Sequence, residues 1–158
     1  MKNFSKIEAW LASAAGKPCS EMAVGENNRL TLGFGEGQPD PIRDMPDRKQ
    51  FEWTMGSFFS TAWRVSDGEV ILCGRMESRD NLKIAGKLNP IAIGSFVGVK
   101  VFSKFDVRVN FSSGLYVEFM SAVGFDDTMF YIVGPDGYEA TYSCLQGWDL
   151  KQRSRPVK

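Results

Sequence analysis

The sequence of 158 residues contains no histidine. Histidine is the side chain whose unperturbed pKa lies nearest neutrality, and it is the commonest protein ligand of metal ions. Its absence excludes Ser-His-Asp and Cys-His nucleophile systems. Neither a Ser-x-x-Lys pair nor the spacing of a calcium-binding loop takes its place. We therefore expect no catalytic residue, no cofactor and no metal site, and the protein is predicted not to be an enzyme.

Cysteine is scarce, and long apolar runs are missing. Cys19, Cys73 and Cys144 form an odd count without a C-x-x-C pair, which argues against a disulfide framework and favours a reducing compartment. No apolar run approaches the roughly 20 residues that a membrane-spanning helix needs. The first residues, MKNFSKIEAW, lack the apolar block and cleavage site of a signal peptide. The expected location is the cytoplasm, without membrane contact.

Positive charge is sparse in residues 101–150. This segment has two basic residues against seven acidic ones, so its net charge is two minus seven, or −5. Its aromatic residues alternate with acidic ones and not with Lys or Arg, so nucleic-acid binding is not expected. The final stretch KQRSRPVK returns four positive charges, and residues 149–158 are predicted to be a flexible basic tail.

The size of the chain indicates one domain over residues 1–158. Within it, residues 1–50 are predicted to hold a helix, a short strand and a proline-rich loop, and residues 51–148 to hold antiparallel hairpins. The fold class is therefore α+β, mainly antiparallel β. We expect a curved sheet or partly closed barrel with an N-terminal helix and one short helix.

Two helices follow from spacing and capping signals. Ser5 and Glu8 have the spacing of a capping box before an apolar face, which predicts a helix over residues 6–15. A shorter helix is predicted around residues 80–88, with Leu82, Ala85 and Leu88 on its apolar side.

Two hairpins have readable registers. The stretch DVRVNFSSGLYVEFM (106–120) alternates apolar and polar residues around a loop with Gly114, which pairs Arg108 with Glu118 on the polar face. In residues 60–73, Asp67-Gly68 predicts a two-residue turn that places Val65 opposite Val70.

The polar face of the 106–120 hairpin has two interpretations. It is either a solvent face with a charge pair or part of a binding surface. Aromatic residues are enriched at interface centres, and an acidic surrounding selects a basic partner. The candidate partner-binding residues are Tyr116, Glu118, Asp126, Asp127, Asp136 and Glu139.

The order of motifs from residue 51 to residue 145 resembles a known group of proteins. The motifs are WRVSDGEVIL (63–72), DNLKIAGKL (80–88), FDVRVNF (105–111) and SGLYVEF (113–119). They resemble small bacterial proteins encoded beside polymorphic toxins, including immunity proteins of contact-dependent growth inhibition systems. The resemblance implies a cytoplasmic protein that binds and neutralises one cognate toxin domain, such as a nuclease, without catalysis.

Two alternatives stay open. A partly closed barrel could bind a small molecule or act as a carboxylate-dependent enzyme, with loop 35–50 as a lid and Trp53 or Trp63 as a stacking wall. A scaffold domain with no ligand of its own is the other alternative.

Overall fold

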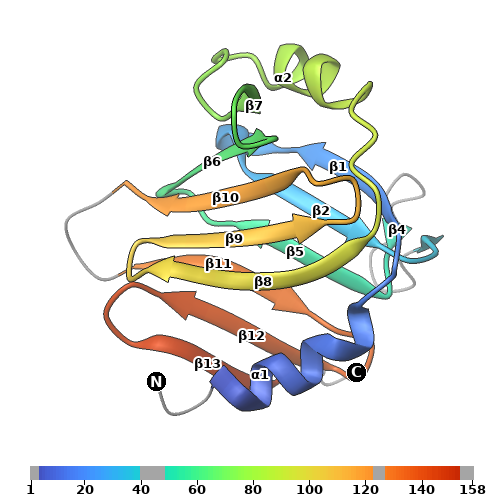
Figure 1. Cartoon of the computed structure of the whole chain (residues 1–158), viewed down its shortest axis with the longest axis vertical. Helices are drawn as coiled ribbons and strands as arrows, with labels where there is room; N and C mark the ends of the chain where they lie inside the picture. The colour runs from blue at the N-terminus through green and yellow to red at the C-terminus, as the bar shows by residue number, and fades with distance from the viewer. Residues whose placement is uncertain (1–3, 40–48, 123–126, 154–158) are drawn as a thin grey trace.

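The computed structural model describes residues 4–39, 49–122 and 127–153. These residues form two antiparallel sheets and two α-helices, with a separate two-stranded ribbon. The larger sheet has six strands in the order β1-β2-β5-β11-β12-β13, and the smaller has five in the order β7-β6-β10-β9-β8. Figure 1 shows the five-stranded sheet in front of the six-stranded sheet. The predicted α+β class with mainly antiparallel strands is confirmed.

The bounds of the elements follow chain order. The helices are α1 (Phe4–Leu11) and α2 (Asn81–Leu88). The six-stranded sheet contains β1 (Cys19–Val24), β2 (Leu30–Phe34), β5 (Trp53–Ser57), β11 (Thr128–Val133), β12 (Tyr138–Ser143) and β13 (Gly147–Gln152). The five-stranded sheet contains β6 (Thr61–Ser66), β7 (Ile71–Gly74), β8 (Phe96–Ser103), β9 (Asp106–Phe111) and β10 (Tyr116–Ser121). The ribbon pairs β3 (Gln38–Pro39) with β4 (Lys49–Gln50).

The core lies between the facing sides of the two sheets. Alternation along the strands sends one set of side chains inward and the other outward, and aromatic rings join the sheets across the core. Phe119 of the smaller sheet packs on Phe130 of the larger one, with ring centroids 4.6 Å apart. Phe34 packs on Phe96 and Phe111 at 5.6 and 6.0 Å. The outer faces of the two sheets therefore point in opposite directions.

The two sheets are not closed into a barrel. The two sheets remain separate in the described residues, with β7 and β8 as the edges of the smaller sheet and β1 and β13 as the edges of the larger. The register of β8 against β9 shifts between Phe96 and Gly98 and again between Val101 and Ser103. These irregularities twist β8 locally, and backbone hydrogen bonds link its start to the segment that leads into β1, where Gly16 N donates to Phe96 O and Phe96 N donates to Lys17 O.

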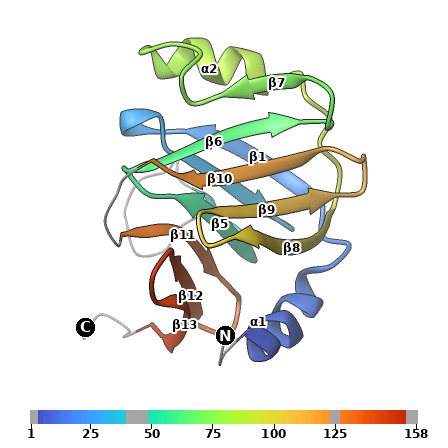
Figure 2. The same cartoon turned by 60° about the vertical axis from the view of Figure 1, so that its left-hand side comes forward.

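Both helices lie beside the ends of the sandwich. Figures 1 and 2 show α2 next to β7 at one end and α1 next to β13 at the other. Ser5 lies inside α1, so the predicted capping box, with Ser5 before the first turn, is wrong. The bounds of α2 confirm the shorter predicted helix, and Asp80 caps it by accepting from the Leu82 amide. However, the buried side chains of α2 are Ile84 and Leu88, while Leu82 is 76% exposed.

The two predicted hairpins have different outcomes. In β9–β10, Arg108 pairs with Glu118, and Gly114 has a φ of 86°, so the register and the left-handed turn position are confirmed. In β6–β7, Val65 lies opposite Cys73 and not Val70. The pairing differs because the two-residue turn is Gly68-Glu69 and not Asp67-Gly68, with the Asp67 amide donating to the Val70 carbonyl, and because the register shifts again between Val65 and Ser66.

The predicted flexible tail is wrong over residues 149–152. They belong to β13, where Leu150 pairs with Ala140 and Lys151 with Glu139. The strand was not predicted because an edge strand with one solvated face contains few apolar residues, and this segment is rich in charged side chains. Residues 154–158 lie outside the described part of the chain.

Candidate binding surface

Two of the predicted acidic residues have partners in the fold. Glu118 accepts from Arg64 Nε at 2.5 Å and from Arg108 Nη2 at 2.6 Å. Asp127 accepts from Ser60 Oγ at 2.6 Å. A carboxylate already satisfied by neighbours is less available to an external partner.

Two more of these residues also have intramolecular roles. Asp136 accepts from Trp10 Nε1 at 2.9 Å, which ties the β11–β12 turn to α1. Glu139 pairs with Arg153 at 3.3 Å. Asp126 lies outside the described residues.

The predicted acidic residues do not gather on one surface. Glu118 is on the outer face of the five-stranded sheet, as its register with Arg108 requires. Glu139 is on the outer face of the six-stranded sheet, since its neighbour Ala140 is buried. Glu118 and Glu139 therefore lie on the outer faces of two different sheets. The acidic residues predicted from the sequence are therefore distributed, within the described part of the chain, over both sheets.

The outer face of the five-stranded sheet has a different character. A row of paired residues crosses four strands, with Lys100 beside Arg108, Arg108 beside Glu118, and Glu118 beside Arg64. Adjacent side chains in such a row lie about 5 Å apart at Cβ. We call this surface the arginine face and define it by six residues: Arg64, Lys100, Phe102, Arg108, Tyr116 and Glu118.

Arg108 is held between two aromatic rings at the centre of the arginine face. Its Cζ lies 4.0 Å from the Phe102 centroid and 3.9 Å from the Tyr116 centroid. Lys100 Nζ is 4.7 Å from the same Phe102 ring. Arg108 Nε is buried and has no hydrogen-bond acceptor among the residues that the structure describes. The rings therefore fix the guanidinium plane, while Glu118 engages one end of it.

The charge of Glu118 depends on its two arginines. Burial, the largest influence, raises the pKa of this carboxyl because the ionised form loses hydration. The hydrogen bonds and charges of Arg108 and Arg64 together outweigh burial and hold the pKa below the ordinary value of 4.5. Glu118 is therefore ionised at neutral pH and neutralises part of the row.

Only part of the arginine face could be predicted from the sequence. Alternation within the 106–120 hairpin places Tyr116 and Glu118 on its polar face. Arg64 lies beside Glu118 only because β6 pairs with β10. Arg64 and Glu118 are separated by 54 positions in the sequence. A sequence pattern gives the side of a strand on which a residue lies, but not the strand beside it.

The cysteines have the surroundings of structural thiols. Burial raises the pKa of Cys73, which is fully buried, and raises that of Cys19 to about 12. A thiol with a raised pKa holds little thiolate, the nucleophilic form, at neutral pH. All three cysteines lie in the described residues, and no disulfide joins them.

Two open grooves lie away from the arginine face. One, of about 810 Å³, lies between residues 26–28 and 75–81, and the other, of about 580 Å³, lies near Asp127 and Lys151. Over residues 4–39, 49–122 and 127–153, no cluster of three or more acidic or cysteine side chains could hold a metal ion. Neither helix in this part of the chain is long and apolar enough to cross a bilayer.

Comparisons with known proteins give no match: no family model, no curated protein and no solved structure matches this chain.

Proposed function

We propose that this protein is a non-enzymatic binding module, and specifically an immunity protein that binds and neutralises a cognate bacterial toxin domain in the cytoplasm. The motif order of residues 51–145 suggests this role. The arginine face supports a binding role because it presents a fixed arginine, a tyrosine and a phenylalanine on rigid paired strands. Arg and Tyr are among the residue types that contribute most to binding energy at protein interfaces.

The arginine face is the observation that carries this proposal. Phe102 is 49% exposed beside Lys100, which is also exposed, so aromatic and cationic groups are accessible together. The side chain of Arg108 is 24% exposed and already ordered by the two rings. An ordered side chain loses less conformational entropy when it binds.

Two structural features argue against the small-molecule alternative. The sheets do not close into a barrel that could enclose a ligand. Trp53 and Trp63 are 1% and 2% exposed, so neither can form the stacking wall of an open pocket. Most of the predicted lid, residues 40–48, lies outside the described residues.

Co-expression tests the proposal. The full chain is expressed with the C-terminal domain of the protein encoded immediately upstream, and host growth and complex formation are measured. We expect that domain to stop growth alone and the full chain to restore growth through a stable complex. A harmless neighbour, or one that kills in the presence of this chain, would overturn the immunity role.

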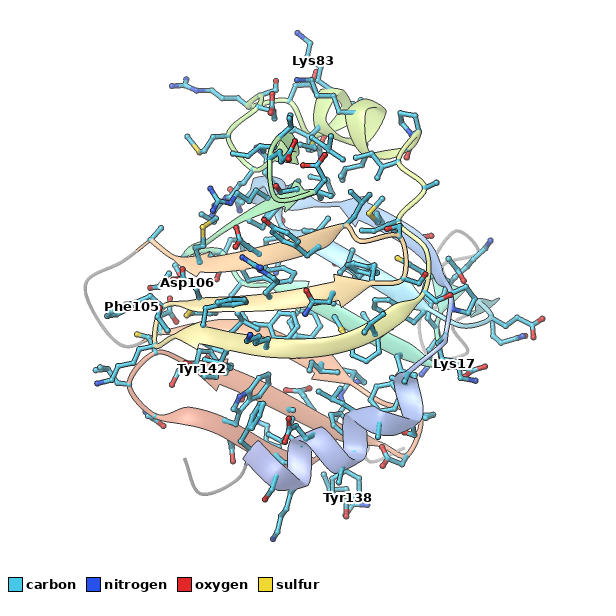
Figure 3. All side chains as sticks on the ribbon, in the orientation of Figure 1. Lys17, Lys83, Phe105, Asp106, Tyr138 and Tyr142 are labelled. Carbon is cyan, nitrogen blue, oxygen red and sulfur yellow. The ribbon has the colours of Figure 1, made fainter. Side chains whose placement is uncertain are left out.

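Two tyrosine variants test whether the arginine face binds the toxin domain. Tyr116→Ala is expected to weaken the complex by about tenfold or more, because the ring contributes contact area and holds Arg108. Tyr138→Ala is the matched control, since Tyr138 is 39% exposed and lies near α1, on the other sheet (Figure 3). Equal affinities of the two variants would remove the arginine face as the binding site.

A further inference from the structure

We propose that the arginine face recognises carboxylate groups on the surface of its protein partner. This inference rests on the proposed binding function and names the chemistry of its partner. It differs from the expectation drawn from the sequence, in which an acidic surface selected a basic partner.

The accessible charge of the arginine face is positive. Its row holds three cations, Lys100, Arg108 and Arg64, against one carboxylate. The side chain of Glu118 is only 11% exposed, whereas that of Arg64 is 41% exposed. An approaching partner therefore meets the cations and not the carboxylate that lies beneath them.

Other described carboxylates lie at the margin of this face, including Asp106 and, on either side of Gly68 next to Tyr116, Asp67 and Glu69. Asp106 begins β9 and accepts from Ser103 Oγ at 2.8 Å. Figure 3 shows Asp106 beside Phe105, at the end of the sheet near the β8–β9 turn. Lys100, in contrast, has no ion-pair partner among the described residues, so its charge is available for a carboxylate from outside.

The geometry of Arg108 favours carboxylate over a nucleic acid base. Single-stranded nucleic acid binds to sheets by stacking bases on free aromatic faces. Here the guanidinium of Arg108 covers one face of Phe102 and one face of Tyr116, and Lys100 also lies over Phe102. The aromatic groups thus orient cations, which bind carboxylates through charge-assisted hydrogen bonds.

A titration of the isotope-labelled full-length protein tests this recognition. The probes are octaglutamate, octalysine and octathymidylate, each followed by chemical-shift changes at low salt. We expect octaglutamate to shift amide resonances of the arginine face and to bind more tightly than the other two. Added salt should weaken this binding, because the charges that carry it are exposed.

Two lysine variants test whether octaglutamate binds at the arginine face. Lys100→Glu is expected to weaken octaglutamate binding by about fivefold. Lys83→Glu is the matched control, since Lys83 is an exposed lysine on α2, at the far end of the molecule (Figure 3). A loss that is equal in both variants, or tighter binding of octathymidylate or octalysine, would overturn the inference. Unchanged melting temperatures confirm that both variants fold.

The outcomes separate this inference from the immunity role. Octaglutamate binding on the arginine face with a harmless upstream neighbour supports carboxylate recognition and removes the toxin assignment. A toxin complex whose affinity is unchanged by Lys100→Glu supports the immunity role and removes carboxylate recognition by the arginine face.

Discussion

Glu118 lies between Arg64 and Arg108 on the outer side of β10, and its side chain is 11% exposed. Removing one member of such a group leaves the others without compensation, which is costly where water is largely excluded. The two guanidinium groups depend on the same carboxylate, so this residue is expected to stabilise the fold more than an exposed acid does.

Glu118→Gln tests that role. Glutamine keeps the size of the side chain but leaves both arginines without a counter-charge, and we expect a loss of about 2 kcal/mol in unfolding free energy. Urea unfolding at neutral pH measures the loss. Glu69→Gln, at an exposed turn position, is the control and should change stability by less than about 0.5 kcal/mol. Equal effects of the two substitutions would contradict the role of Glu118.

The same carboxyl predicts the direction of a pH effect. Because the pKa of Glu118 in the folded state lies below its ordinary value of 4.5, the ionised form stabilises the fold above that pH. The stabilisation is lost as the pH falls through the folded pKa. Unfolding free energies measured from about pH 6 down to about pH 3 should therefore fall more steeply for the native sequence than for Glu118→Gln. Parallel curves would contradict the prediction.

Glycine has opposite consequences in the sheet and in the helix. Gly56 of β5 lies under the ring of Tyr131, and a Cβ there would lie 2.6 Å from the tyrosine oxygen. Gly86 of α2 has nothing within 4 Å of a Cβ. β5 therefore needs glycine at position 56 for packing. In α2, Gly86 serves no packing role, and it destabilises the helix because glycine loses more conformational entropy on folding than alanine does.

Two alanine substitutions test this difference. Gly56→Ala is expected to destabilise the protein by about 2 kcal/mol, because the Tyr131 ring must move. Gly86→Ala should stabilise it by about 0.5–1 kcal/mol. Thermal and urea unfolding measure both changes. In a Tyr131→Ala background most of the cost of Gly56→Ala should vanish, and a cost that persists there would show that the ring is not its cause.

At the scale of the whole molecule, both sheets share one core. Cys73 of β7 is fully buried in the smaller sheet, and Cys144, 5% exposed, directly follows β12 of the larger sheet. Aromatic contacts such as Phe119 with Phe130 connect the two sheets. If this core is one cooperative unit, exposing either thiol requires global unfolding.

Alkylation with iodoacetamide, read by mass spectrometry, tests this cooperativity. We expect Cys73 and Cys144 to react slowly and at the same rate in the native protein, and both to lose their protection over the same range of urea. In concentrated denaturant all three cysteines should react rapidly, which shows that the reagent is effective. Reaction of Cys144 well before Cys73 would mean that the sheets open separately.

Local patterns predicted the elements whose partners are near in sequence. The β9–β10 register followed from alternation around Gly114, and the place of α2 followed from apolar spacing, although its buried face holds Ile84 and not the predicted Leu82. Such contacts depend on a few neighbouring residues, so the sequence contains their determinants. Where the turn was displaced by one residue and the strand register shifted beside it, as between Val65 and Ser66, even a local register was wrong.

The sequence by itself determined the antiparallel class, the absence of histidine chemistry and the polar side of the 106–120 hairpin. The tertiary structure alone decided that β6 lies beside β10, which brings Arg64 to Glu118 and makes the accessible face cationic. It also separated the acidic residues onto opposite faces of the sandwich. Strand order depends on packing the whole core between two sheets, and that constraint is not contained in the alternation of any single strand.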